Sequence, residues 1–132
     1  MAYLLDTNAL IYLFKNQGNV RQRVALRQDH EICMCTPVLW ELKTGALKSS
    51  QPEAALQKLA FAQSRFKLLS FDEVCADQAA RVRASLERQG TPIGPIDTLI
   101  AGTALAHELT LVTRNLREFQ RVPGLAVEDW YS

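Results

Sequence analysis

The sequence lacks the features that would place it outside ordinary globular proteins. It has only six glycines and five prolines among 132 residues, which argues against a fibrous or low-complexity chain. No apolar run approaches the roughly 20 residues that a membrane helix needs, and the amino terminus lacks the basic region and apolar core of a secretion signal. We therefore expect a cytoplasmic protein with no membrane partner.

Cysteine is also scarce, and the odd number of three fits a reducing compartment. A chain of this length needs no disulfide or metal to fold. Cys33 and Cys35 would share one face of a strand, with His30 nearby, so a soft-metal site is one interpretation. One histidine with two such cysteines is a poor ligand set, however, and buried thiols are the favoured interpretation.

An excess of one charge is missing too, because 15 Lys and Arg face 14 Asp and Glu, for a net charge of +1. The overall charge therefore gives no argument for nucleic-acid binding, and any such argument must come from local clusters. Basic side chains do recur along the predicted helices, where a solvated face is the commoner explanation. The residues left as candidates for contact with an RNA backbone are Lys43, Arg81, Arg88 and Arg114.

The sequence does contain short apolar runs that alternate with amphipathic segments. Because parallel neighbours need crossover connections, this alternation predicts one α/β domain over residues 1–132, a three-layer α/β/α fold with a mainly parallel sheet of four to five strands. We predict strands that end at Asp6 and over 31–35, 67–70, 109–113 and 125–127, and helices over 7–15, 20–27, 38–48, 52–65, 71–89 and 97–108.

Three local predictions accompany these elements. Thr7 and Asn8 are the residue types that cap a helix, and Thr36 with Pro37 reads as the cap and first position of the third helix. The helix over 71–89 is expected to turn Val74 toward the core, together with Cys75, Ala79, Val82 and Leu86.

Acidic residues recur near one edge of the predicted sheet. Asp6 ends the first strand, Glu41 lies in the opening turns of a helix, Asp97 lies in the first turn of another, and Glu118 follows the fourth strand. Right-handed crossovers bring the carboxyl ends of parallel strands to one edge, so these side chains are expected to converge. Helix capping alone would also explain an acid such as Asp97.

Clustered carboxylates repel one another, which raises the pKa of at least one of them unless a cation offsets the charge. A ligand set made only of oxygen favours Mg²⁺ or Mn²⁺ over zinc. Such an ion generates hydroxide from bound water and stabilises a leaving oxygen, and the natural reaction is hydrolysis of a phosphodiester.

Four motifs, in order, resemble the PIN-domain ribonucleases and, more narrowly, the VapC toxins of bacterial toxin–antitoxin pairs, of the enteric type. The likeness covers essentially the whole chain and includes the closing segments 121–125 and 128–130. The motifs are Leu4-Leu5-Asp6-Thr7-Asn8, Trp40-Glu41-Leu42 with Gly45-Ala46, Gly94-Pro95-Ile96-Asp97-Thr98-Leu99-Ile100-Ala101, and Val112-Thr113-Arg114-Asn115 with Glu118-Phe119.

The resemblance implies that Asp6 and Asp97 are the core metal ligands and that Glu41 binds the ion directly or through water. Thr7 or Thr113 would orient a bound water or phosphate. The chain departs from the family at the fourth acid, because Asn115 stands where many relatives have Asp and the nearest acid is Glu118. The fourth ligand is thus Asn115 or Glu118, and one ion is expected without substrate.

The resemblance further implies a toxin that acts as a Mg²⁺-dependent endoribonuclease, with Mn²⁺ able to substitute. Its substrate would be a structured RNA, commonly a tRNA anticodon stem-loop and here favouring the initiator tRNA, so that cleavage stops translation and growth. It implies a homodimer, held in a larger hetero-oligomer by a VapB-type antitoxin that alone contacts operator DNA. That antitoxin's tail would cover the active site, with an arginine among the acids.

Apolar residues of the first helix favour such a partner. Leu10, Tyr12, Leu13 and Phe14, with the helix over 52–66, supply apolar surface that an amphipathic antitoxin helix could cover, although burial in the core explains most of it.

Three other functions remain as alternatives. A Mg²⁺-binding receiver-like signalling domain would have paired acids after its first strand, whereas Asp6 stands alone. A haloacid-dehalogenase-like phosphatase would have a second Asp where Asn8 stands. A catalytically weak module that binds RNA or an antitoxin is favoured only by Asn115.

Overall fold

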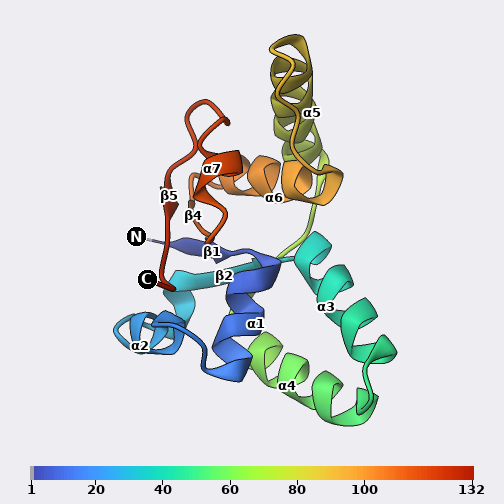
Figure 1. Cartoon of the computed structure of the whole chain (residues 1–132), viewed down its shortest axis with the longest axis vertical. Helices are drawn as coiled ribbons and strands as arrows, with labels where there is room; N and C mark the ends of the chain where they lie inside the picture. The colour runs from blue at the N-terminus through green and yellow to red at the C-terminus, as the bar shows by residue number, and fades with distance from the viewer. Residues whose placement is uncertain (1) are drawn as a thin grey trace.

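A five-stranded parallel sheet crosses the middle of the protein in the order β3-β2-β1-β4-β5 (Figure 1). This computed structural model describes residues 2–132. The predicted three-layer α/β/α architecture is confirmed, and the strand order differs from the 2-1-3-4-5 order of receiver domains. The strands are β1 (Tyr3–Leu5), β2 (Ile32–Cys35), β3 (Lys67–Leu69), β4 (Thr110–Val112) and β5 (Val127–Glu128).

Helices cover both faces of this sheet. Figure 1 shows α1 to α4 on one side and α5 to α7 on the other, with α5 extending away from the sheet beyond α6. Within residues 2–132, no helix has the length and apolar character needed to cross a membrane. The helices are α1 (Thr7–Lys15), α2 (Val20–Ala25), the 3₁₀ turn η1 (Asp29–Glu31), α3 (Thr36–Lys48), α4 (Pro52–Arg65), α5 (Glu73–Arg88), α6 (Pro95–Ala106) and α7 (Leu116–Phe119).

The central position of β1 explains why its residues are apolar without alternation. β1 pairs with β2 on one side and with β4 on the other, and helices cover both of its faces. Leu4, Leu5, Met34 and Leu111 are completely buried as a result. The first residue after β1 is therefore held at the middle of the sheet's carboxyl edge.

Two predicted helix caps were wrong. Asp6 itself caps α1, because its Oδ1 accepts a hydrogen bond of 2.8 Å from the backbone N–H of Ala9. Helix α3 begins at Thr36 with Cys35 as its cap residue, and the Thr36 hydroxyl accepts from the backbone N–H of Phe71 at 3.0 Å. The Asp6 cap is a local contact, whereas the Thr36 contact joins residues 35 positions apart and is not revealed by local sequence.

Two further predictions need correction. Val74 is 58% exposed, because it lies off the buried face of α5, which Cys75, Ala79, Val82 and Leu86 form. The last strand is Val127–Glu128 rather than 125–127, since its register is set by pairing with Leu111 and Val112.

Helix α6 is held against α5 by a close contact between small residues. A Cβ atom on Gly102 would lie 2.6 Å from the Cβ of Ala79, closer than two carbon atoms can approach. This packing fixes α6, and with it the acidic residue in its first turn, relative to the rest of the fold.

Candidate active site

Four acidic residues from separate elements influence one another at the carboxyl edge of the sheet. The pKa of Asp97 is raised to about 6, first by burial and then by the negative charges of Asp6, Glu118 and Glu41. Asp6 follows β1, Glu41 lies in α3, Asp97 lies in the first turn of α6 and Glu118 lies in α7. The convergence that the topology suggested is therefore present as an electrostatic cluster.

Asp6 is the most deeply buried of the four, with only 6% of its surface exposed. Its backbone N–H donates to the carbonyl of Val112 at 3.1 Å, which continues the pairing of β1 with β4 and aims the side chain. Burial raises the pKa of Asp6, although hydrogen bonds from the Thr113 side chain and the Ala9 N–H oppose that rise. The carboxylate is thus held in one orientation by two donors.

The Thr7 and Thr113 hydroxyls each contact an acid. Thr7 Oγ1 donates to Glu41 Oε1, a contact that ties the start of α1 to α3. The Thr113 side chain hydrogen-bonds to Asp6, and Thr113 Oγ1 also accepts from the backbone N–H of Asn115 at 2.9 Å. The two hydroxyls therefore hold the acids in place. The Thr7–Glu41 bond escaped sequence reasoning, because it joins residues 34 positions apart.

Glu118 and Asn115, the two candidates for the fourth metal ligand, differ in their burial and contacts. Glu118 is half-buried and contributes to the raised pKa of Asp97. Asn115 is exposed, and its contact with the cluster is made by its backbone N–H rather than by its amide. The geometry thus brings Glu118, one helical turn farther along, toward the other acids.

The donor chemistry of this cluster suits a hard divalent cation. Its four carboxylates provide only oxygen, and their mutual repulsion is the condition that a bound cation relieves. Among residues 2–132, no group of three or more Asp, Glu, His or Cys side chains is placed closely enough to hold a metal ion without a shift of side chains. Asp6 and Glu41 are held by the N–H and O–H donors just described.

The raised pKa of Asp97 predicts how the metal-free protein responds to pH. A carboxyl whose pKa rises from 3.8 to about 6 on folding destabilises the fold as pH increases through that window. The full shift would correspond to about 3 kcal/mol, and solvent screening of this partly exposed group reduces our expectation to about 1–2 kcal/mol. In EDTA, Asp97→Asn should therefore melt above the parent at pH 8 and together with it at pH 4.

The control for this prediction is Asp77→Asn, which changes an exposed carboxylate on α5. It should not alter the pH dependence of melting. Melting curves followed by circular dichroism test both variants, and an Asp97→Asn protein that melts below the parent at pH 8 in EDTA would contradict the prediction.

The four basic residues that are candidates for contact with an RNA backbone make different contacts in the structure. Arg114 directly follows Thr113 and lies 3.7 Å from the centre of the Tyr131 ring. Arg81 is paired with Asp77 at 3.0 Å on the exposed face of α5. Lys43 and Arg88 are exposed on α3 and α5. The aromatic contacts of Arg114 were missed from the sequence, since nothing local links residue 131 to residue 114.

The parallel sheet and the acids gathered at its carboxyl edge make this an α/β protein with an acidic site. The chain belongs to the PIN-domain family, because a model of the PIN domain matches residues 3–125. Full-length similarity is to VapC proteins in particular. The tRNA(fMet)-specific endonuclease VapC of Shigella flexneri is 43% identical over 131 residues, and that of Salmonella typhimurium 41%, each match covering 98% of both chains.

Solved structures agree with this assignment. A crystal structure of DNA-bound VapBC from Salmonella typhimurium matches with a TM-score of 0.92 at 41% identity, covering 98% of each chain. A structure of VapBC2 from Rickettsia felis, bound to a DNA fragment from its promoter, matches with a TM-score of 0.90 at 35% identity and covers 98% of this chain and 99% of that one.

Proposed function

We propose that this protein is the toxin of a toxin–antitoxin pair and a metal-dependent endoribonuclease that cuts tRNA, with initiator tRNA as its favoured substrate. The observation that carries the proposal is the Asp97 carboxylate, which lies within the field of three other acids at the sheet edge. Two full-length relatives above 40% identity are named for cleavage of tRNA(fMet).

In this proposal, Asp6 and Asp97 hold the ion, and Glu41 and Glu118 flank it directly or through water. The ion is Mg²⁺, for which Mn²⁺ can substitute, and when bound it supplies an activated water and stabilises the leaving oxygen. The protein's own contribution is orientation. The Ala9 N–H and Thr113 fix Asp6, while the Thr7 hydroxyl fixes Glu41.

The proposed antitoxin would dock in an apolar groove between α1, α2 and α4. This groove has a volume of 610 Å³, and its apolar lining includes Leu13, Phe14, Ala25 and Phe61. Leu10 does not contribute, because it is completely buried in the core. An apolar groove between helices is the surface that an amphipathic helix covers.

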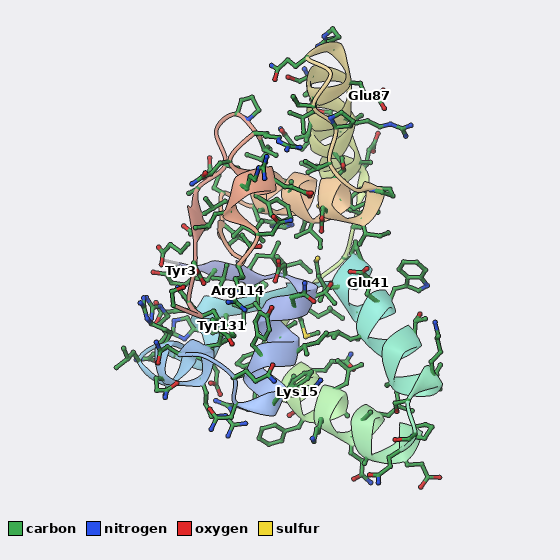
Figure 2. The ribbon with its side chains drawn as sticks, viewed as in Figure 1. Tyr3, Lys15, Glu41, Glu87, Arg114 and Tyr131 are labelled. Carbon is green, nitrogen blue, oxygen red and sulfur yellow. The ribbon has the colours of Figure 1, made fainter. Side chains whose placement is uncertain are left out.

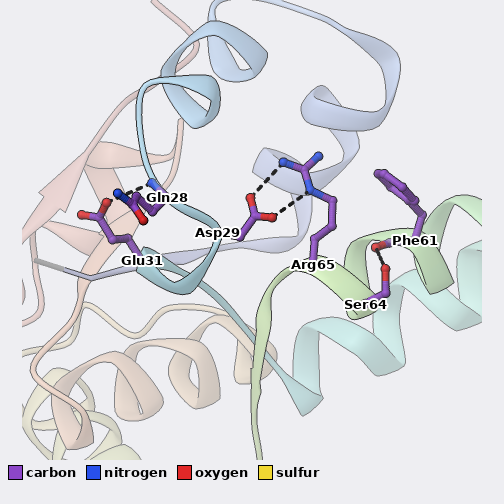
Figure 3. A network of polar contacts seen from close by, with 6 residues as sticks. All are labelled: Gln28, Asp29, Glu31, Phe61, Ser64 and Arg65. Atoms are coloured by element: carbon purple, nitrogen blue, oxygen red, sulfur yellow. Dashed lines mark hydrogen bonds and ion pairs between the residues drawn. The ribbon is translucent and has the colours of Figure 1, made fainter.

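Two residues of α4 that line this groove, Phe61 and Arg65, contact each other. Arg65 of α4 forms an ion pair of 2.9 Å with Asp29 of η1, and its guanidinium lies 5.5 Å from the centre of the Phe61 ring (Figure 3). Phe61 itself is 62% exposed. An exposed phenylalanine on a braced helix can be covered by a partner without rearrangement of the fold.

A second groove of 430 Å³ continues the first toward the acids. The two share Phe14, Ala54 and Lys58, and the second is also lined by Glu41. A helix seated in the first groove could thus continue as a segment that reaches the acidic cluster, where an arginine would replace the cation's charge. The homodimer and the larger hetero-oligomer with the antitoxin, which alone contacts operator DNA, stay predictions.

The proposed activity is tested by incubating the purified protein with tRNA(fMet), an elongator tRNA and duplex DNA in Mg²⁺. We expect one main cut in tRNA(fMet), at least about tenfold slower cleavage of the elongator tRNA, equivalent to about 1.4 kcal/mol, and no cleavage of DNA. Sequencing gels of end-labelled RNA give the position of the cut. Antitoxin binding without cleavage of any RNA would instead support the catalytically weak binding module.

A further inference from the structure

The carboxyl-terminal residues fold back onto the α1–α2 connection. The Tyr131 carbonyl accepts a hydrogen bond of 2.9 Å from the backbone N–H of Asn19, and the Tyr131 N–H donates to Asp129 Oδ1 at 2.8 Å. Gly18, at φ +60°, lies under the tyrosine, and a Cβ there would be 2.6 Å from its ring. Tyr131 is therefore fixed at both its backbone and its ring.

The guanidinium of Arg114 packs against the Tyr131 ring. The Arg114 guanidinium lies 3.7 Å from the centre of the Tyr131 ring and 5.9 Å from that of Tyr12, and the two rings meet edge to face at 4.8 Å. Figure 2 shows Arg114 and Tyr131 together on one side of α1, with Glu41 on the other. Side-chain hydrogen bonds to Tyr12 and Tyr131 also hold the guanidinium, and because it has five N–H donors, others stay available for a further contact.

Arg114 differs from several other arginines of the protein in the groups that hold its guanidinium. Arg65, Arg81 and Arg83 form the ion pairs found in residues 2–132. Arg114 has no such pair. The charge of Asp129 is near it, but both Asp129 oxygens accept hydrogen bonds, from the Tyr131 N–H and from the Ser132 hydroxyl. Arg114 is exposed, and the rings and side-chain hydrogen bonds of Tyr12 and Tyr131 hold it.

Its place in the chain puts the backbone of Arg114 beside the acidic cluster. Arg114 follows Thr113, whose side chain bonds to Asp6, and consecutive Cα atoms are about 3.8 Å apart. A site with four carboxylates repels the phosphates of its own substrate, so a fixed cation at its rim offsets that repulsion.

We propose that Tyr131 is a positioning residue that holds the Arg114 guanidinium at the rim of the acidic site, where it binds an RNA phosphate next to the one that is cut. This rests on the proposed ribonuclease function. A guanidinium already stacked on a ring loses less conformational freedom when it binds, which is how a residue 17 positions from Arg114 would act on substrate affinity.

The test is steady-state cleavage of tRNA(fMet) by Arg114→Ala, Tyr131→Leu, the double variant and Tyr131→Phe. We expect Arg114→Ala and Tyr131→Leu each to raise KM roughly 3- to 10-fold with kcat within about twofold, because a binding contact is lost. The double variant should be no worse than Arg114→Ala, since Tyr131 acts through Arg114. Tyr131→Phe keeps the ring and loses only the weaker side-chain hydrogen bond to Arg114, so its KM should stay within about twofold of the parent value.

Binding of tRNA(fMet), measured in Ca²⁺ at several salt concentrations, gives a second readout. Loss of one phosphate contact should reduce the slope of log Kd against log salt by about 0.7 in both Arg114→Ala and Tyr131→Leu. The control, Arg83→Ala, removes an exposed α5 charge and should change neither KM nor slope.

The outcomes separate this proposal from the function on which it rests. A parent protein that cuts no RNA would overturn the proposed function. A parent that cuts tRNA(fMet) while Tyr131→Leu lowers kcat at unchanged KM would make Tyr131 a merely structural residue. Additive effects of the two substitutions would show that Tyr131 does not act through Arg114, and either result would overturn the inference.

Discussion

Asp97→Asn is expected to reduce tRNA cleavage by more than about 1,000-fold, equivalent to about 4 kcal/mol of transition-state stabilisation, while the fold is retained. Asparagine has the shape of aspartate but cannot carry the charge that holds a divalent ion. Asp97 is partly exposed in the first turn of α6, and no hydrogen bond that caps this helix comes from its side chain. Its replacement should therefore leave the structure intact.

Asp6 needs a more careful substitution than Asp97. Its carboxylate is both a proposed metal ligand and the cap of α1, through the 2.8 Å bond from the Ala9 N–H. Asp6→Ala would lose that cap, at a cost of about 1 kcal/mol. Asp6→Asn keeps an oxygen for the cap and so avoids that cost, although the amide offers one oxygen to the two donors, Ala9 N–H and Thr113, and its melting temperature must be measured beside its cleavage.

The measurement is the initial rate on tRNA(fMet) in Mg²⁺, in EDTA and after Mg²⁺ is restored. The parent should lose cleavage in EDTA and regain it fully, whereas Asp97→Asn should stay inactive throughout. Asp77→Asn, an exposed acid on α5, serves as the matched control and should cut at the parent rate. Cleavage by Asp97→Asn within tenfold of the parent would refute the assigned role.

Phe61→Glu is expected to weaken the complex with the antitoxin about 100-fold, or about 2.7 kcal/mol, without lowering ribonuclease activity. The substitution places a charge in the apolar groove between α1, α2 and α4. Because Phe61 is 62% exposed, the free protein should tolerate the glutamate. The partner for this measurement is the proposed antitoxin, which we expect to be a small protein encoded directly upstream.

The control for Phe61→Glu is Val74→Glu, which changes a 58% exposed apolar residue of α5, on the opposite side of the sheet. Titration calorimetry with the purified antitoxin gives both affinities. An antitoxin that binds Phe61→Glu as tightly as the parent would show that another surface is used.

Prediction of the elements succeeded where the signal was local. Helices α1 and α4 have the predicted bounds, because turn residues at 16–19 and Pro52 mark a terminus of each. Errors arose where a tertiary contact set the boundary. The last strand pairs where β4 is available, and Val74 lies off the face of α5 that packs against α6.

The sequence by itself determined the α/β class, the parallel sheet and the edge at which the acids gather. These follow from strand–helix alternation and from the handedness of crossover connections, which depend on order along the chain. The tertiary structure alone decided which groups meet there. It joined Thr7 to Glu41, brought Glu118 toward Asp97 and placed Arg114 against Tyr131. These contacts depend on how separate elements pack, and no local pattern encodes that.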